Sequence, residues 1–278
     1  MENSQFKSIL SYSPFLRRSL AAVCGSEEES AQIEAMKSLA ATAPDMEAIR
    51  ASLSGVRDEE ELALRMRELR RELIMRLLVR DALRIGGYPE VVSSMTRFAE
   101  ITVQAAVKSV VTSLAERFGV PCSENTGQPQ DLLVVGMGKL GGAELNVSSD
   151  IDLIFLYDED GETQESGFKP RRSISNREFF ERASRRIIPL LSDIRGCGFV
   201  FRVDMRLRPD GDSGPMACSS GMLEEYLYTE GREWERFAWI KARIVSSPVF
   251  SSEQQFRGQC SSVSSLVRPF VYRKYVDF

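Results

Sequence analysis

Hydrophobic residues recur at helical spacing through most of residues 1–120. Between residues 58 and 85 the apolar positions follow one another at three- and four-residue intervals: Leu62, Met66, Leu69, Leu73 and Leu77. This spacing predicts one buried helix face, with the charged remainder, Arg67 included, on a solvated face. Gly86 and Gly87 are expected to end this helix. A second helix is expected from just after Pro89 to Phe118.

Beyond residue 120 the pattern changes to short apolar runs. Residues 121–130 (PCSENTGQPQ) are rich in turn-forming residues and are predicted to form a linker. The expected elements after it are strands over 132–135, 151–157 and 198–208 and helices over 175–195 and 219–243, the last interrupted near Gly231. A capping box of Ser175 and Glu178 marks the start of the first of these helices. The serine-rich stretch 246–265 has no clear pattern. Helices followed by an α/β unit predict an α+β chain, divided into a helical region 1–120 and a second domain 121–278.

The composition restricts the chemistry that the chain can perform. Its 278 residues are 43% hydrophobic and 27% charged, which is ordinary for a soluble globular protein. A net charge of −4 gives no general argument for nucleic-acid binding. The chain contains no histidine, so the commonest general base and transition-metal ligand is missing. Catalysis must therefore use carboxylates, Lys, Arg, Tyr, backbone amides or a hard metal ion held by oxygen.

The location is predicted from cysteine usage and from the absence of long apolar runs. Five cysteines, an odd number with no CxxC pair, argue against a disulfide framework. No apolar run is long enough for a signal peptide or a membrane span. We therefore expect a reducing, cytoplasmic location and no membrane partner.

Two acidic residues stand at the start of the predicted strand 151–157. Asp150 and Asp152 are two residues apart, so their side chains share a face, about 6.6 Å apart along the strand. Two carboxylates at this spacing repel each other unless a cation lies between them. Oxygen ligands of this kind suit Mg²⁺, which takes one or two carboxylates and completes its shell with water and phosphate oxygens. The alternative is a pair of solvated acids at a strand edge.

The predicted strand 198–208 (GFVFRVDMRLR) adds a third acid. Along it Phe199, Phe201, Val203, Met205 and Leu207 alternate onto one face, and Val200, Arg202, Asp204, Arg206 and Arg208 fall on the other. If this strand lies beside 151–157, Asp204 joins Asp150 and Asp152 around the metal ions. Arg206 and Arg208 would then flank the site as phosphate clamps. An exposed amphipathic strand is the alternative.

A glycine-rich turn, GMGKLGG, lies between the first two predicted strands. Gly136, Gly138, Gly141 and Gly142 permit backbone amides to approach a phosphate closely, and Lys139 adds a cation. The turn matches neither a Walker A motif nor a Rossmann fingerprint, and alone it is a weak signal. Ser148 and Ser149, just before Asp150, can also hydrogen-bond phosphate. Together these features suggest a two-metal nucleotidyltransferase site, which needs no protein base if the nucleophile is already ionised.

Three long motifs resemble a known family. GMGKLGGAELNVSSDIDLIFLY (136–157), FRVDMRLRPDGDSGP (201–215) and EGREWERFAWIKARIV (230–245), with the final VRPFVYRKYVDF, are similar to the bifunctional glutamine synthetase adenylyltransferase/adenylyl-removing enzymes of bacteria. The resemblance implies a nucleotidyltransferase-like (DNA polymerase beta-like) mixed sheet with flanking helices over 121–278. It also implies Asp150 and Asp152 as the metal-binding pair and Asp204 as the third acid, with two Mg²⁺ ions and ADP or ATP as nucleotide.

The resemblance is to the N-terminal half of that family, which removes AMP from a glutamine synthetase tyrosine with inorganic phosphate and releases ADP. The expected partners are adenylylated glutamine synthetase and, as a regulator, the nitrogen-regulatory PII protein. Because the family continues beyond the position of Phe278, adenylylation is expected to be absent and removal is left open. The alternatives are a nucleotidyltransferase with another acceptor, or a non-catalytic fragment that binds glutamine synthetase or PII.

The motif GREWERFAWIKAR admits two interpretations. Its helix is expected to pack Trp234, Phe237 and Ile240 in the core and leave its charges solvated. The alternative is a contact surface for substrate or nucleotide. Lys241 and Arg243 are left open between the two.

Overall fold

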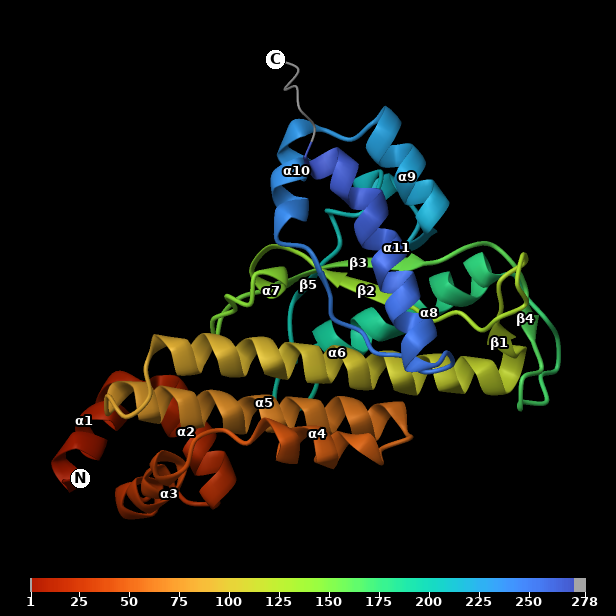
Figure 1. The fold of residues 1–278 in the computed structure, drawn as a ribbon. Coiled ribbons are helices and arrows are strands. Elements are labelled where there is room, and N and C mark those ends of the chain that lie inside the picture. The colour runs from red at the N-terminus through yellow and green to blue at the C-terminus, as the bar shows by residue number, and fades with distance from the viewer. Residues whose placement is uncertain (1, 273–278) are drawn as a thin grey trace.

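The computed structural model of the chain describes residues 2–272 (Figure 1). Its helices are α1 Asn3–Tyr12, α2 Pro14–Cys24, α3 Glu29–Ala41, α4 Met46–Ser54, α5 Glu59–Ala82, α6 Tyr88–Phe118, α7 Gly138–Gly141, α8 Asn176–Ser192, α9 Ser220–Thr229, α10 Glu233–Ile240 and α11 Glu253–Val271, with a 3-10 turn, η1, over Gly211–Ser213. The helical N-terminal region and its two long helices are confirmed. Within residues 2–272, no helix combines the length and apolar character needed to cross a membrane.

The strands build a mixed sheet, which confirms the α+β class. They are β1 Val120–Pro121, β2 Leu133–Gly136, β3 Ile151–Tyr157, β4 Thr163–Gln164, β5 Val203–Asp204, β6 Ala217–Ser219 and β7 Arg243–Ile244. The main sheet has the order β5-β3-β2-β7, and β6 also pairs with β3, beyond the end of β5. β2 is antiparallel to β3 and β7, whereas β3 is parallel to β5 and β6. β1 and β4 form a separate antiparallel pair.

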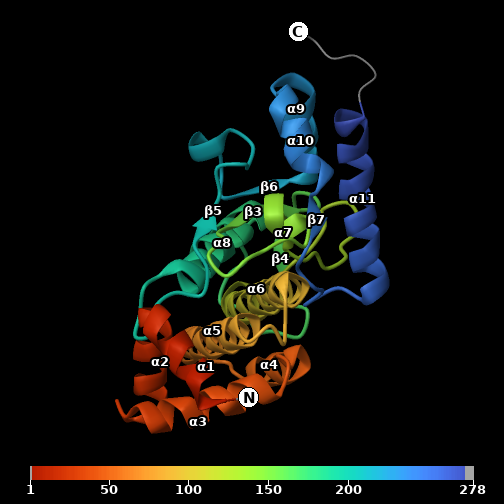
Figure 2. The same cartoon turned by 90° about the vertical axis from the view of Figure 1, so that its left-hand side faces the viewer.

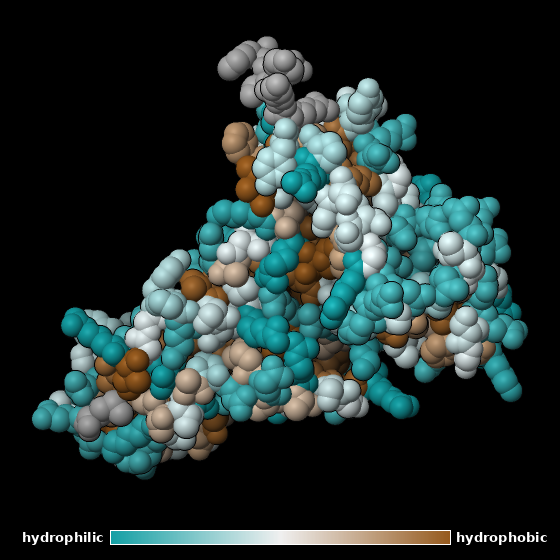
Figure 3. Space-filling model, in the orientation of Figure 1, coloured by the Kyte–Doolittle hydropathy of each residue, from teal (hydrophilic) through white to brown (hydrophobic). Residues whose placement is uncertain are grey.

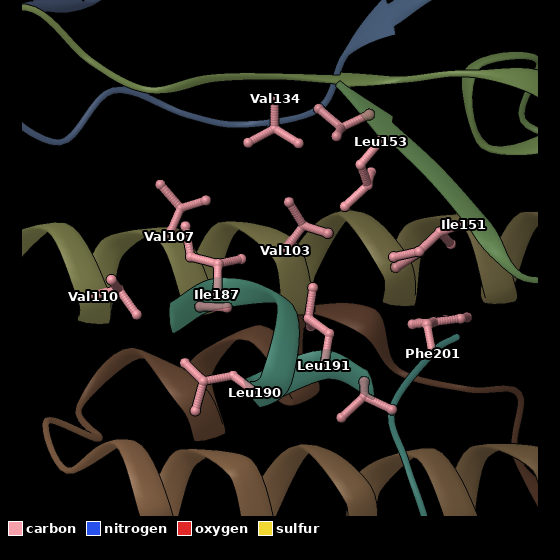
Figure 4. Packing of buried hydrophobic residues seen from close by; sticks show 14 of the residues in the cluster. Val103, Val107, Val110, Val134, Ile151, Leu153, Ile187, Leu190, Leu191 and Phe201 are labelled. Atoms are coloured by element: carbon pink, nitrogen blue, oxygen red, sulfur yellow. The ribbon is translucent and has the colours of Figure 1, made fainter. Parts of the chain in front are cut away.

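Helices cover both faces of this sheet, which explains why β3 is apolar along almost its whole length. The side chains of Ile151, Leu153 and Phe155 pack in the main core with residues of α6 and α8. Among these are Val103 of α6 and Leu191 of α8 (Figure 4). Residues of opposite parity on β2 and β3 pack against α9, α10 and α11 in a second cluster. The side view in Figure 2 shows these layers, with α9 and α10 on the far side of the sheet from α5 and α6.

The long helices α5 and α6 belong to the same hydrophobic core as the sheet. The prediction that residues 121–130 form a linker is wrong. Cys122 and Gln130 are buried, and the segment is hydrogen-bonded to neighbouring parts of the chain. Asn176 donates to the carbonyl of Cys122 at 2.7 Å, and Gln130 donates to the carbonyl of Glu159 at 3.0 Å. The segment is therefore a packed turn. The division of the chain at residue 120 stays a prediction.

The predicted strand 198–208 is wrong in length, because only Val203–Asp204 pairs as a strand. Val200 and Phe201 are both fully buried, which strict alternation along a strand would prevent. Both backbone amides donate to the carbonyl of Leu191, at 2.9 and 3.0 Å, and the Phe201 ring packs 5.9 Å from that of Phe98. The segment thus enters the core as an irregular turn and becomes a strand only briefly.

The serine-rich stretch 246–265 has no clear pattern in the sequence, yet most of it lies in α11. Ser252 caps this helix in a capping box with Gln255. Phe256, Val263 and Val267 recur on its buried side, against the second core cluster. The many serines weaken the apolar pattern, but the spacing of these three residues is helical.

The aromatic face of α10 is also opposite to the prediction. Trp234, Phe237 and Ile240 are 52, 73 and 57% exposed, and Figure 3 shows hydrophobic surface over this helix. The helix has only two turns and buries Glu235 and Trp239 instead. Glu235 accepts a hydrogen bond from the Tyr226 hydroxyl at 2.8 Å, which satisfies its buried carboxylate. The core interpretation of the three apolar residues is therefore wrong.

The position of Arg67 also differs from the prediction. Expected on the solvated face, it is 1% exposed and donates to the carbonyls of Ala63, Asp193 and Gly198, at 2.6, 2.6 and 2.9 Å. Burial lowers its pKa. A guanidinium offers five donors, so one side chain can satisfy several buried carbonyls at once. Arg67 thereby ties α5 to the segment that leads into β5.

We predict that Arg67→Met lowers the free energy of unfolding by about 3 kcal/mol, because its hydrogen bonds to the carbonyls of Ala63, Asp193 and Gly198 are lost inside the protein. Arg65→Met on the same helix is the matched control. Arg65 is exposed and pairs with Glu68 at the surface, so its loss is expected to cost within about 0.5 kcal/mol. Urea denaturation measures both values. Equal effects of the two substitutions would contradict the role assigned to Arg67.

Candidate active site

The β3–β5 pairing brings the predicted acids together. In the parallel ladder Ile151 lies opposite Val203, and Asp152 lies opposite Asp204. The amide of Ile151 donates to the carbonyl of Arg202 at 2.9 Å, which extends the pairing toward Asp150. Residues opposite each other in a ladder point to the same face, and Asp150 shares that parity. The expected adjacency of the two segments is thus confirmed.

Of the three acids, Asp152 is the one on which the charges of the other two act. Its half-burial raises the pKa of its carboxyl, and the negative charges of Asp150 and Asp204 raise it further. Asp150 and Asp204 are therefore both close enough to act on Asp152. A carboxylate in this position is destabilised until a cation or a proton neutralises it.

The glycine turn lies directly against Asp152. The amide of Met137 donates to the backbone carbonyl of Asp152 at 2.9 Å. A Cβ at Gly138, whose φ is +52°, would stand 3.0 Å from Asp152 Oδ2. Gly138 is therefore the position in this turn where the absence of a side chain serves the acidic site.

Two other glycines of the turn are required for packing. A Cβ at Gly141 would stand 2.1 Å from the carbonyl oxygen of Lys241, and one at Gly136 would press on Leu140 at 2.8 Å. Gly142 also borders the side chain of Lys241. Lys139 is exposed at the surface of the turn. The glycine content of the motif thus reflects the close approach of the segment before β7 as much as the site.

Ser148 and Ser149 shape the turn that leads into Asp150. The amide of Ser148 donates to the side-chain oxygen of Asn146 at 3.0 Å, and the hydroxyl of Ser149 accepts from the amide of Asn146 at 3.2 Å. Both serines thus lie in the turn before Asp150 and take part in the hydrogen bonds that shape it.

Arg206 and Arg208 occupy different environments. The Arg206 guanidinium bonds both carboxylate oxygens of Asp204, and this contact lowers the pKa of Asp204. Arg208 is nearly buried and donates to the carbonyl of Met205 at 2.7 Å. Both line an open pocket of about 580 Å³ that also contains Asp150 and Asp204. Only Arg206 presents its charge to solvent.

Two further arginines support the acids and were not predicted in this role. Arg202 donates to the carbonyl of Ser148 at 2.7 Å. Arg70, from α5, lies 4.7 Å over the Phe199 ring and reaches toward the carbonyl of Val147, and its burial lowers its pKa to about 10. No sequence pattern near Arg70 indicates this contact, because Val147 lies far away along the chain. The helical region therefore helps to hold the turn before Asp150.

The donor set fits a hard divalent cation. Within residues 2–272, no three acidic or cysteine side chains already surround a single point closely enough to hold an ion. Mg²⁺ does not require this, since it binds through one or two carboxylates and fills its shell with water and phosphate oxygens. Asp150 and Asp152 could supply such a pair. Asp204 could join them once it is released from Arg206.

Paired strand carboxylates beside a glycine turn are the features from which the sequence predicted a nucleotidyltransferase, and the family to which the chain belongs supports that class. The chain belongs to the glutamate-ammonia ligase adenylyltransferase family, whose sequence profile matches residues 3–257. This places it among nucleotidyltransferases, as its motifs predicted.

Similar proteins carry the name bifunctional glutamine synthetase adenylyltransferase/adenylyl-removing enzyme. The one from Nitrosomonas europaea is 43% identical over 273 residues, covering 98% of this chain and 28% of the relative. Those from Ralstonia nicotianae and Bordetella pertussis are 49 and 51% identical over 220 and 213 residues, covering 79 and 77% of this chain and 22% of each relative. The chain thus spans about a quarter of the length of these relatives.

The raised pKa of Asp152 predicts a pH-dependent stability. Because the folded protein holds this proton more tightly than the unfolded chain, stability falls as the pH rises from the ordinary aspartate pKa to the raised one. The amide in Asp152→Asn does not ionise, so the variant does not lose stability in this way. Without metal at neutral pH it is therefore expected to melt a few degrees above the wild type. The difference should vanish in acid, below the ordinary pKa. Thermal melts across pH measure this difference, and a lower melting temperature for the variant at neutral pH would contradict the cost assigned to the burial and repulsion of the Asp152 carboxylate.

Proposed function

We propose that this chain catalyses the phosphorolytic removal of AMP from an adenylylated tyrosine of glutamine synthetase, giving ADP and the unmodified tyrosine. The names of the relatives include an adenylyl-removing activity on this substrate, and the motifs resemble the removing half of the family. The observation that carries the proposal is the ladder register that sets Asp152 opposite Asp204.

The reaction is a displacement at phosphorus. An oxygen of inorganic phosphate attacks the phosphorus of the AMP group, and the bond from that phosphorus to the tyrosine oxygen breaks. The electron pair leaves with the phenolate, which takes a proton from water, and the new bond makes ADP. Phosphate is already ionised at neutral pH, so the attack requires no protein base. This agrees with the absence of histidine from the chain.

The residues of this chain act mainly by holding charge. Both reactants are anions, and so are the three carboxylates, so the site requires cations to bring them together. Mg²⁺, held by Asp150 and Asp152 with Asp204 as a further ligand, would neutralise the phosphate oxygens. Lys139 in the glycine turn and Arg206 beside Asp204 are exposed cations, and both would contact phosphate. The PII protein as a regulator remains a prediction from the resemblance.

Incubation of the chain with adenylylated glutamine synthetase, phosphate and Mg²⁺ is expected to release ADP. Asp150→Asn and Asp152→Asn should each lower the rate at least about a hundredfold, because each removes a charge on which the bound cation depends. ADP release is followed by a coupled assay, with loss of AMP from glutamine synthetase confirmed by mass spectrometry.

Asp158→Asn is the matched control, because Asp158 follows the opposite end of the same strand β3. It should leave the rate unchanged. Absence of ADP from the wild type, with binding of glutamine synthetase retained, would contradict the proposal and favour a binding role. ADP release that survives both substitutions at Asp150 and Asp152 would remove these residues from the mechanism.

A further inference from the structure

Arg206 saturates the third acid of the site. Its Nε lies 3.0 and 2.9 Å from Oδ1 and Oδ2 of Asp204, and its Nη2 lies 2.5 Å from Oδ2. The backbone amide of Arg206 also donates to Oδ1, at 2.9 Å. Both carboxylate oxygens of Asp204 are therefore occupied by one arginine two residues later in the chain.

The other two acids have no such counterion. Among residues 2–272, Asp150 and Asp152 form no ion pair, whereas Asp204 does. In the described part of the chain, Asp150 and Asp152 are thus the acids of the site without a paired cation, and the divalent cation is expected there first. At Asp204 the guanidinium of Arg206 supplies the positive charge that a bound metal ion would otherwise supply.

We propose that Arg206 is an exchangeable counterion: it pairs with Asp204 while the site lacks metal, and it releases Asp204 to the bound cation and turns to the phosphate oxygens of the nucleotide. This inference rests on the proposed function, since it concerns the same site. It assigns to one side chain two partners of the same charge, a carboxylate in one state and a phosphate in the other.

The geometry permits this exchange at Arg206 and opposes it at Arg208. The side chain of Arg206 is 77% exposed, so it can turn without disturbing the core, whereas that of Asp204 is 17% exposed and its backbone is fixed by the β3 ladder. Arg208 is buried and bonded to the carbonyl of Met205. Moving its guanidinium would leave buried polar groups without partners. The mobile clamp is therefore Arg206.

The exchange can be tested by Mn²⁺ affinity in four proteins: wild type, R206Q, D204N and the double variant. If Arg206 competes with the cation for Asp204, R206Q should bind Mn²⁺ roughly three- to fivefold more tightly than wild type at low salt, the range of an exposed bidentate pair. In the D204N background the same substitution should change the affinity less than about twofold, because the contested ligand is absent. Calorimetry or Mn²⁺ electron paramagnetic resonance gives each affinity.

A matched variant separates competition from simple charge. R206K keeps the positive charge but loses the planar fork, so it should fall between wild type and R206Q. The ¹⁵Nε resonance of Arg206, assigned by its loss in R206Q, should shift on addition of Mg²⁺ to the wild type and stay unchanged in D204N.

The outcomes distinguish the exchange from the function on which it rests. If R206Q raises the Mn²⁺ affinity equally in both backgrounds, or if the Arg206 resonance does not shift when Mg²⁺ is added, the exchange is overturned and the metal site stays in place. A wild type that binds no Mn²⁺ would overturn the metal site together with the exchange.

Discussion

A parallel ladder of only two residue pairs, Ile151 with Val203 and Asp152 with Asp204, determines where the acids of this protein stand. A shift of one residue would turn Asp204 to the opposite face, because side chains alternate along a strand. So short a ladder gains its register from its surroundings. Phe201 is held in the core beside Phe98, and Arg67 fixes the chain before it.

The N-terminal helices therefore do more than cover the sheet. From α5, Arg67 fixes the segment that leads to Asp204, and Arg70 reaches the turn that leads to Asp150. Both are long-range contacts between a helical residue and the backbone of a segment that leads into the site. They give a physical reason for the two regions to share one core. They also keep Asp152 close to the negative charges of Asp150 and Asp204, which costs some stability in the absence of metal.

The parts of the fold that follow from local pattern could be predicted, and the parts that depend on distant contacts could not. The strand 151–157 is a continuous apolar run that starts at the paired acids, the long helices have strong helical periodicity, and all of these elements are present. Arg67 has the same helical phase as a solvated residue, and only distant carbonyls explain its burial. Phe201 alternates as in a strand, yet the core takes it together with Val200. The exposed face of α10 follows from the short length of that helix and from the buried Glu235–Tyr226 contact, which no spacing reveals. Arg206 could be placed beside the acids, but its bond to Asp204 depends on rotamers that a sequence does not specify.

The central claim is that these carboxylates share divalent cations beside the glycine turn. The most direct test is a crystal structure of the chain with Mn²⁺ and ADP, using anomalous scattering to locate the metal. We predict a peak at about 2.0–2.2 Å from oxygens of Asp150 and Asp152, with the phosphates of ADP completing the shell. Ordered ADP whose Mn²⁺ lies away from both carboxylates would contradict the account.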